Sequence, residues 1–86
     1  MRVSVELSMY PLVEQYKSPI IEFVESLRQR EGIEIETNGM SSHLYGEYDD
    51  IMSVLNGEMK KVFENGPKVV MVMKVVNDDL SGPVKF

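Results

Sequence analysis

Apolar and polar residues alternate along the first part of the chain. In residues 2–10, every second position is apolar, and the positions between them carry charged, hydroxyl or phenolic groups. The apolar members are Val3, Val5, Leu7 and Met9. Because neighbouring side chains of a strand point to opposite faces, this pattern predicts a strand with one face in a core. Pro11 follows, lacks an amide hydrogen, and is predicted to stop the strand ladder.

Helical spacing begins after this strand. Ser18 followed by Pro19 predicts a helix N-terminus, with serine as the cap and proline in the first helical position. Apolar residues then recur on one helical face at Ile20, Ile21, Phe23, Val24 and Leu27. Gly32 is predicted to close the helix.

The middle of the chain predicts a hairpin and a second helix. Strands over 33–37 and 40–47 flank Asn38-Gly39, a pair that tolerates the positive φ of a tight hairpin turn. Asp49 is predicted to cap a helix over roughly 50–65, which Gly66-Pro67 ends. Gly57 lies inside this helix, either for a close approach or as an ordinary surface glycine.

The last regular segment, 68–76, is apolar at both odd and even positions apart from Lys74. Such a strand is predicted to be covered on both faces. The following "SGPVKF" is either a loose tail or a segment whose Val84 and Phe86 pack on a neighbouring subunit.

These elements predict one α+β domain over 1–86. The order βαββαβ is that of the ferredoxin-like sandwich, a four-stranded antiparallel sheet with two helices on one face. The second sheet face would carry both polar side chains and half of the apolar last strand. That mixture favours a homodimer or homotetramer packed through the sheet face, with a small-molecule crevice at its edge.

Composition narrows the possible functions. The chain has 86 residues, no cysteine, and a formal net charge of −5 with its nine basic residues scattered. Nucleic acid is therefore not an expected partner, and disulfides and thiolate metal sites are impossible. The chain has a single histidine, so we expect no metal site. No apolar run approaches ~20 residues, so we expect no membrane insertion and a cytoplasmic protein.

Catalytic groups are few. The obvious nucleophile and base lie in "SSH", where Ser42 and His43 point to opposite faces of a strand. Ser41 and His43 share a face, but a spacing of about 6.6 Å along the strand predicts no direct hydrogen bond. We therefore expect a protein that is not an enzyme and needs no cofactor. His43 itself fits either the sheet face or a ligand contact.

Three segments resemble a known family. "LSMYPLVEQYKSPIIEFVESL", "IETNGMSSHLYG" and "VVMVMKVV" are similar to the thiamine/hydroxymethylpyrimidine-binding family, the YkoF-like proteins with a ferredoxin-like fold. The most specific pieces are "S-x-Y-P" at Ser8–Pro11 and "S-S-x-x-x-G" at Ser41–Gly46. The resemblance implies modules that bind the pyrimidine part of thiamine without chemical change and pair through their sheets.

The resemblance also suggests which residues bind. An aminopyrimidine needs an aromatic surface and a few hydroxyl or amide partners, and a thiazolium cation suits a carboxylate or a ring face. The candidates for the pyrimidine are Ser8, Tyr10, Asn38, Ser41 and Ser42; those for the thiazolium are Glu6, Tyr45 and Glu47.

The resulting hypothesis is non-catalytic binding of thiamine or its hydroxymethylpyrimidine precursor, supporting thiamine uptake or salvage. Two alternatives stay open: a regulatory or structural interaction module without a ligand pocket, and an enzyme that uses His43 at a subunit cleft.

Overall fold

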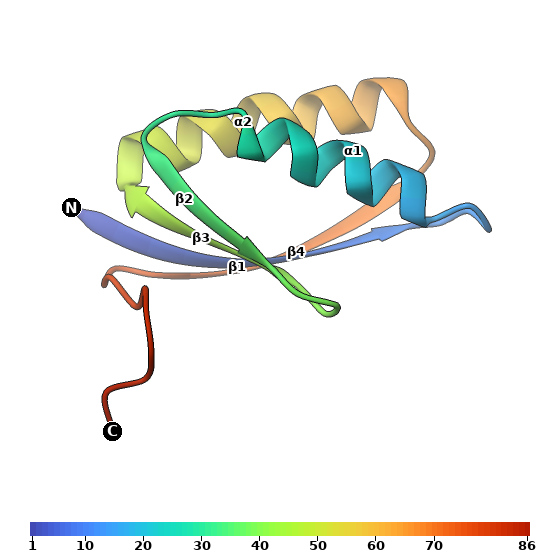
Figure 1. The fold of residues 1–86 in the computed structure, drawn as a ribbon. Helices are drawn as coiled ribbons and strands as arrows, with labels where there is room; N and C mark the ends of the chain where they lie inside the picture. The colour runs from blue at the N-terminus through green and yellow to red at the C-terminus, as the bar shows by residue number, and fades with distance from the viewer.

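A computed structural model describes residues 1–86 and has two helices packed on one face of a four-stranded antiparallel sheet (Figure 1). The elements in chain order are β1 (Arg2–Pro11), α1 (Lys17–Arg28), β2 (Ile33–Thr37), β3 (Ser42–Glu47), α2 (Tyr48–Asn65) and β4 (Val69–Val76). The strand order in the sheet is β2-β3-β1-β4. Every pair of neighbouring strands in the sheet runs antiparallel. This is the predicted ferredoxin-like fold.

The register divides the sheet into a helix face and an open face. On the helix face, Val5 of β1 lies opposite Leu44 of β3, and Val5 also pairs with Val75 of β4. On the open face, Glu6 lies between His43 and Lys74. The alternation of β1 therefore places its apolar set under the helices, as the sequence predicted.

The core lies between the helix face and the two helices. Its members are apolar side chains from β1, β3 and the two helices, almost fully removed from water: Val3, Val5, Leu7, Phe23, Leu27, Leu44, Ile51 and Leu55. Burying an apolar side chain of this size stabilises the folded state by about 1.5–3 kcal/mol. The apolar faces of the sheet and of both helices thus provide the core that stabilises the fold.

The start of α1 differs from the prediction. The helix begins at Lys17 with Tyr16 as its cap residue, and no side chain caps it. Ser18 and Pro19 instead lie in the first turn, where proline is tolerated because that amide has no helical acceptor. After α1 ends at Arg28, Gly32 takes a φ of +83° in the turn that leads into β2.

The β2–β3 connection is also longer than predicted. β3 begins at Ser42 rather than at residue 40, and neither Asn38 nor Gly39 has a positive φ. The prediction of a two-residue turn is wrong because the Asn38 side chain shapes a four-residue loop. Its Oδ1 accepts hydrogen bonds from the amides of Met40 (2.8 Å) and Ser41 (3.1 Å).

The predicted second helix is present, with its start shifted. It begins at Tyr48, so Asp49 lies inside the first turn rather than at the cap, where its charge suits the positive end of the helix dipole. A Cβ added at Gly57 would meet no atom within 4 Å. Gly57 is therefore a surface glycine, and no element approaches it closely.

The expectation that the last strand is covered on both faces is wrong for a single chain. β4 is an edge strand, and on its open face Val70 and Val72 are 46% and 50% exposed. On its helix face, Met73 and Val75 remain 38% and 48% exposed, because the helices leave this part of β4 uncovered. An apolar strand surface of this kind is typical of an interface.

Pro11 does not stop the ladder as predicted. β1 stays paired with β4 through Pro11, which lies opposite Val69. The β1–β3 ladder ends four residues earlier, at Leu7 opposite Ser42, because β3 begins there. Residues 8–11 of β1 therefore have a free edge on the side where β3 is missing.

No helix of the structure has both the length and the apolar composition needed to cross a membrane.

Candidate functional site

A cavity of about 290 Å³ lies where the free edge of β1 faces α1 and the β2–β3 loop. We call it the edge crevice. It is lined by Leu7, Met9, Tyr10, Pro11, Tyr16, Ile20, Phe23, Val24, Thr37, Asn38, Gly39, Met40, Ser41 and Ser42. This space exists because β3 begins only at Ser42, and a strand that began earlier would fill it.

Aromatic and apolar groups form much of the crevice surface. Tyr10 of β1 is 52% exposed and Tyr16, just before α1, is 49% exposed, so both rings are accessible. Met40 of the β2–β3 loop is also largely exposed. Tyrosine rings offer flat apolar faces together with a hydroxyl that can donate or accept a hydrogen bond.

Amide and hydroxyl groups complete the crevice. The loop interactions of Asn38 use its Oδ1, so its Nδ2 amide remains a donor for a bound group. Ser42 is buried, and its Oγ lies 2.9 Å from Thr37 Oγ1. These two hydroxyls form the back wall between β2 and β3.

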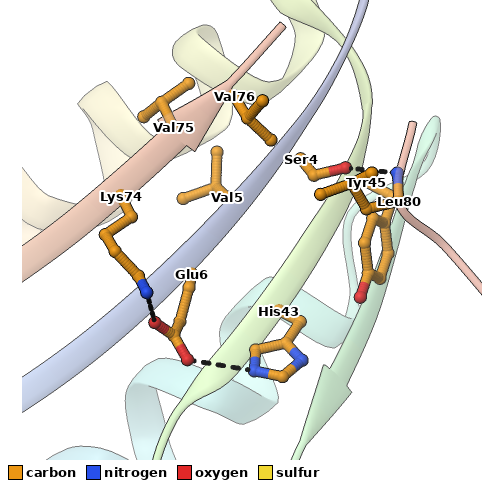
Figure 2. A pocket seen from close by; sticks show the side chains of 9 residues that line it. All are labelled: Ser4, Val5, Glu6, His43, Tyr45, Lys74, Val75, Val76 and Leu80. Atoms are coloured by element: carbon orange, nitrogen blue, oxygen red, sulfur yellow. Dashed lines mark hydrogen bonds and ion pairs between the residues drawn. The ribbon is translucent and has the colours of Figure 1, made fainter. Parts of the chain in front are cut away.

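A second cavity, of about 390 Å³, lies on the open face of the sheet (Figure 2). We call it the open-face pocket. Its lining residues are Ser4, Val5, Glu6, His43, Tyr45, Lys74, Val75, Val76 and Leu80. One part of the lining is apolar and includes Val76 of β4 and Leu80, and the other part, the polar wall, carries Glu6, His43 and Lys74.

Glu6 is the centre of the polar wall. Its carboxylate lies 3.1 Å from Lys74 Nζ, 3.4 Å from His43 Nε2, and accepts a hydrogen bond of 3.1 Å from Ser41 Oγ. Hydrogen bonds from Lys74 and Ser41 hold the pKa of the Glu6 carboxyl below its usual value. The carboxylate charge is therefore already compensated within the chain.

The predicted separation of Ser41 and His43 is wrong. Ser41 Oγ lies 3.0 Å from His43 Nε2, because Ser41 precedes β3 and is not held at regular strand spacing. Glu6 approaches the same ring nitrogen, Nε2. A serine hydrolase relay needs the carboxylate on the opposite nitrogen, so this arrangement is not a catalytic triad.

Tyr45 lies on the open face but is mostly covered. It is 8% exposed, and burial raises the pKa of its phenol, with smaller contributions from the carboxylates of Glu36, Asp79 and Glu34. Little of its ring is available to a ligand in a single chain.

The predicted binding residues fall into separate places. The edge crevice brings together Tyr10, Asn38, Ser41 and Ser42, and the open-face pocket contains Glu6 and Tyr45. Ser41 connects the two through its hydrogen bond to Glu6. Ser8 lies on the open face opposite Val72 and lines neither cavity.

Glu47 is the most distant of the predicted residues. It lies opposite Arg2, eight residues along β1 from Tyr10, which corresponds to about 26 Å of strand. Its carboxylate pairs with the Met1 amine at 3.1 Å. One chain therefore cannot bring Glu47 and Tyr10 to the same small molecule.

The sequence reasoning did not single out Tyr16 and Met40 as lining residues. The sequence held a signal for Tyr16: it is a second aromatic residue close to Tyr10, in the short loop between the first strand and the first helix. No cluster of three or more histidine or acidic side chains is arranged to hold a metal ion.

Comparison with known protein families shows which family the chain belongs to. The family described as "Thiamine-binding protein" matches residues 5–80, which include both helices, β2, β3, β4 and all of β1 after Ser4. The chain belongs to this thiamine-binding protein family. Membership gives it a thiamine-related role as a small-molecule-binding protein.

Solved structures share the fold of this thiamine-binding family member. A Streptococcus pneumoniae protein is 21% identical with a TM-score of 0.83, covering 93% of this chain and 90% of its own. A Thermotoga maritima protein assigned provisionally to thiamine biosynthesis or salvage is 18% identical, TM-score 0.79, with coverage of 91% and 85%. A Methanocaldococcus protein is 21% identical, TM-score 0.76, with coverage of 98% and 88%. No curated protein sequence matches the chain.

Proposed function

We propose that this protein binds thiamine or its hydroxymethylpyrimidine precursor in the edge crevice, without changing it chemically, as a single domain over 1–86. Binding in the cytoplasm would support thiamine uptake or salvage. The observation that carries the proposal is the crevice itself: an aromatic and amide-bearing cavity at the free edge of β1, in a member of the thiamine-binding family.

The chemistry of the crevice suits an aminopyrimidine. Tyr10 offers a ring face for stacking, while Asn38 Nδ2 can donate to a ring nitrogen and Ser41 Oγ can accept from the exocyclic amine. A volume of about 290 Å³ is near the lower end of the range for ligand cavities, roughly 300–1,000 Å³. It favours the pyrimidine as the group that enters, with the rest of thiamine toward solvent.

The role of the other candidates follows from their positions. Ser42 supplies the back wall rather than a first contact, since its hydroxyl is already paired with Thr37. Glu6 accepts a hydrogen bond from Ser41 of the crevice, and because Lys74 already compensates its charge, Glu6 would orient the Ser41 hydroxyl rather than hold the thiazolium cation. Ser8, Tyr45 and Glu47 would contribute only through a second subunit placed on the open face.

Such a second subunit belongs to the proposal. A homodimer or homotetramer packed through the open face would cover Val70 and Val72, which a single chain leaves about half exposed. Binding rather than catalysis is supported by family membership and by the geometry at His43, where serine and carboxylate compete for one nitrogen.

The test is calorimetric titration with thiamine and, separately, hydroxymethylpyrimidine. Wild type and Tyr48→Leu should bind alike, because Tyr48 starts α2 and is outside the crevice. Tyr10→Leu should weaken binding by about 1–2 kcal/mol, because it removes an aromatic stacking surface. Saturating ligand at ~100 times its dissociation constant should also stabilise the wild-type fold by about 2.7 kcal/mol. Absence of heat with both ligands would favour an interaction module without a ligand.

A further inference from the structure

The segment after β4 is fixed at its base by Ser4. The Ser4 hydroxyl, 7% exposed, donates to the Asp78 carbonyl at 2.8 Å and accepts from the Leu80 amide at 2.8 Å. Asp79 pairs with Arg2 at 3.1 Å and accepts a hydrogen bond from the Ser81 amide. Residues 78–81 are therefore held on the open face, and Leu80 closes one end of the open-face pocket.

Beyond this base, the chain turns away from its own sheet. Gly82 has a φ of +82°, and Pro83 restricts the backbone on either side of itself. Residues 82–86 then project on the side of the sheet opposite the helices (Figure 1). Val84 is 69% exposed and Phe86 is fully exposed, so two apolar side chains of this arm have no partner in their own chain.

The open face offers an apolar cavity to such an arm. The open-face pocket, about 390 Å³, has the apolar side chains of Val76 and Leu80 in its lining and is large enough for a phenyl ring. Beside it β2 adds an acidic strip, Glu34 and Glu36, on the same side as Tyr45 and His43; Glu34 pairs with Arg2 at 3.8 Å, and Glu36 has no paired cation. Lys85, between the two apolar residues of the arm, is complementary in charge to this acidic strip.

We propose that residues 82–86 form an exchanged arm, in which Phe86 of one copy enters the open-face pocket of a second copy and Lys85 lies against the partner's acidic strip. This inference rests on the assembly in the proposed function and deepens it by naming the segment that joins the copies. A return to its own pocket would require the arm to reverse within five residues, against the direction set by Gly82 and Pro83. Exchange between two copies satisfies both apolar surfaces at once.

The absence of cysteine permits a direct test. Chains carrying Lys85→Cys, which keep Phe86, are mixed with chains carrying Val76→Cys, oxidised mildly, and analysed by mass spectrometry for the mixed disulfide. The matched control pairs Lys85→Cys with Ile21→Cys, an exposed position on α1 at the other face. We expect the Val76 mixture to give at least about tenfold more mixed disulfide than the Ile21 control. Equal yields would overturn the arm.

Sedimentation of the wild type and of Phe86→Ser separates failure of the arm from failure of the assembly. We expect wild type to associate, and Phe86→Ser to associate at least about tenfold more weakly, as for an aromatic anchor. Equal association of both would overturn the arm and leave the sheet-face assembly standing. A monomeric wild type would overturn the assembly and the arm, while ligand binding is measured independently by titration.

Discussion

Ser41 Oγ and His43 Nε2 lie 3.0 Å apart on the open face, with the Glu6 carboxylate 3.4 Å from the same nitrogen. The three side chains resemble the parts of a hydrolase but are connected differently. Serine and carboxylate share one ring nitrogen, so the carboxylate cannot orient the ring for proton transfer from the serine. The cluster is better understood as a polar network that joins β1, β3 and the β2–β3 loop.

This arrangement predicts the absence of histidine-dependent hydrolysis. The rate at which the wild type cleaves an activated p-nitrophenyl ester should agree within about twofold with the rates of His43→Ala and Ser41→Ala, since no relay activates the hydroxyl. The measurement is initial rate against ester concentration. A saturable wild-type rate that both substitutions remove would contradict it and revive the enzyme hypothesis.

A buried ion pair makes stability depend on pH. Glu58 of α2 is 1% exposed; Arg30 donates from Nε to its Oε1 at 3.1 Å, and Lys61 Nζ lies 3.3 Å from its Oε2. Burial raises the pKa of this carboxyl, but hydrogen bonds from Arg30, Ser26 and Lys61 outweigh it and hold the pKa below its usual 4.5. Because the folded-state pKa is lowered, the stabilisation is present above about pH 4.5 and is lost as the pH falls below it.

Glu58→Gln should therefore lower the free energy of unfolding by about 1–3 kcal/mol at pH 7, since Arg30 loses a charged acceptor. The difference from wild type should shrink at pH 3. Urea denaturation at the two pH values measures both. Glu64→Gln is the control, because its pair with Lys60 at 3.9 Å is exposed and should contribute less than about 1 kcal/mol. If the difference in unfolding free energy between wild type and Glu58→Gln were larger at pH 3 than at pH 7, the lowered pKa of Glu58 would be contradicted.

Two glycines should respond to alanine in opposite directions. Gly32 has a φ of +83°, so Gly32→Ala should destabilise the fold by about 1–2 kcal/mol. Gly57 lies inside α2 with open space around it, so Gly57→Ala should stabilise by about 0.5–1 kcal/mol. Thermal melting followed by circular dichroism distinguishes them, with about 4–8 °C expected per kcal/mol. Shifts of the same sign would be inconsistent with the backbone described for Gly32 or Gly57.

Much of the fold follows from the sequence because its signals are local. The alternation in 2–10 and the helical stripes of 19–27 and 51–63 each identify an element without knowledge of its neighbours. Element ends were less predictable. Asn38 illustrates the reason: its side chain can permit a tight turn or accept loop amides, and only the surrounding strands decide which.

The site was predictable in composition but not in arrangement. Tyr10, Asn38, Ser41 and Ser42 meet in one crevice, yet the crevice exists because β3 begins only at Ser42, and not because of Pro11. Ser41 reaches His43 because it lies outside the strand, which regular spacing could not anticipate. The exposed surface of β4 likewise depends on helix placement and on any second copy, neither of which is a local property.

The location of the ligand is tested most directly by NMR. Backbone amide resonances of the wild-type protein are followed during titration with thiamine and with hydroxymethylpyrimidine. The proposed function predicts that the largest saturable shifts fall in residues 9–12 and 38–42, around the edge crevice. Saturable shifts confined to the open-face pocket around Glu6 and Lys74, or none with either compound, would contradict binding in the edge crevice.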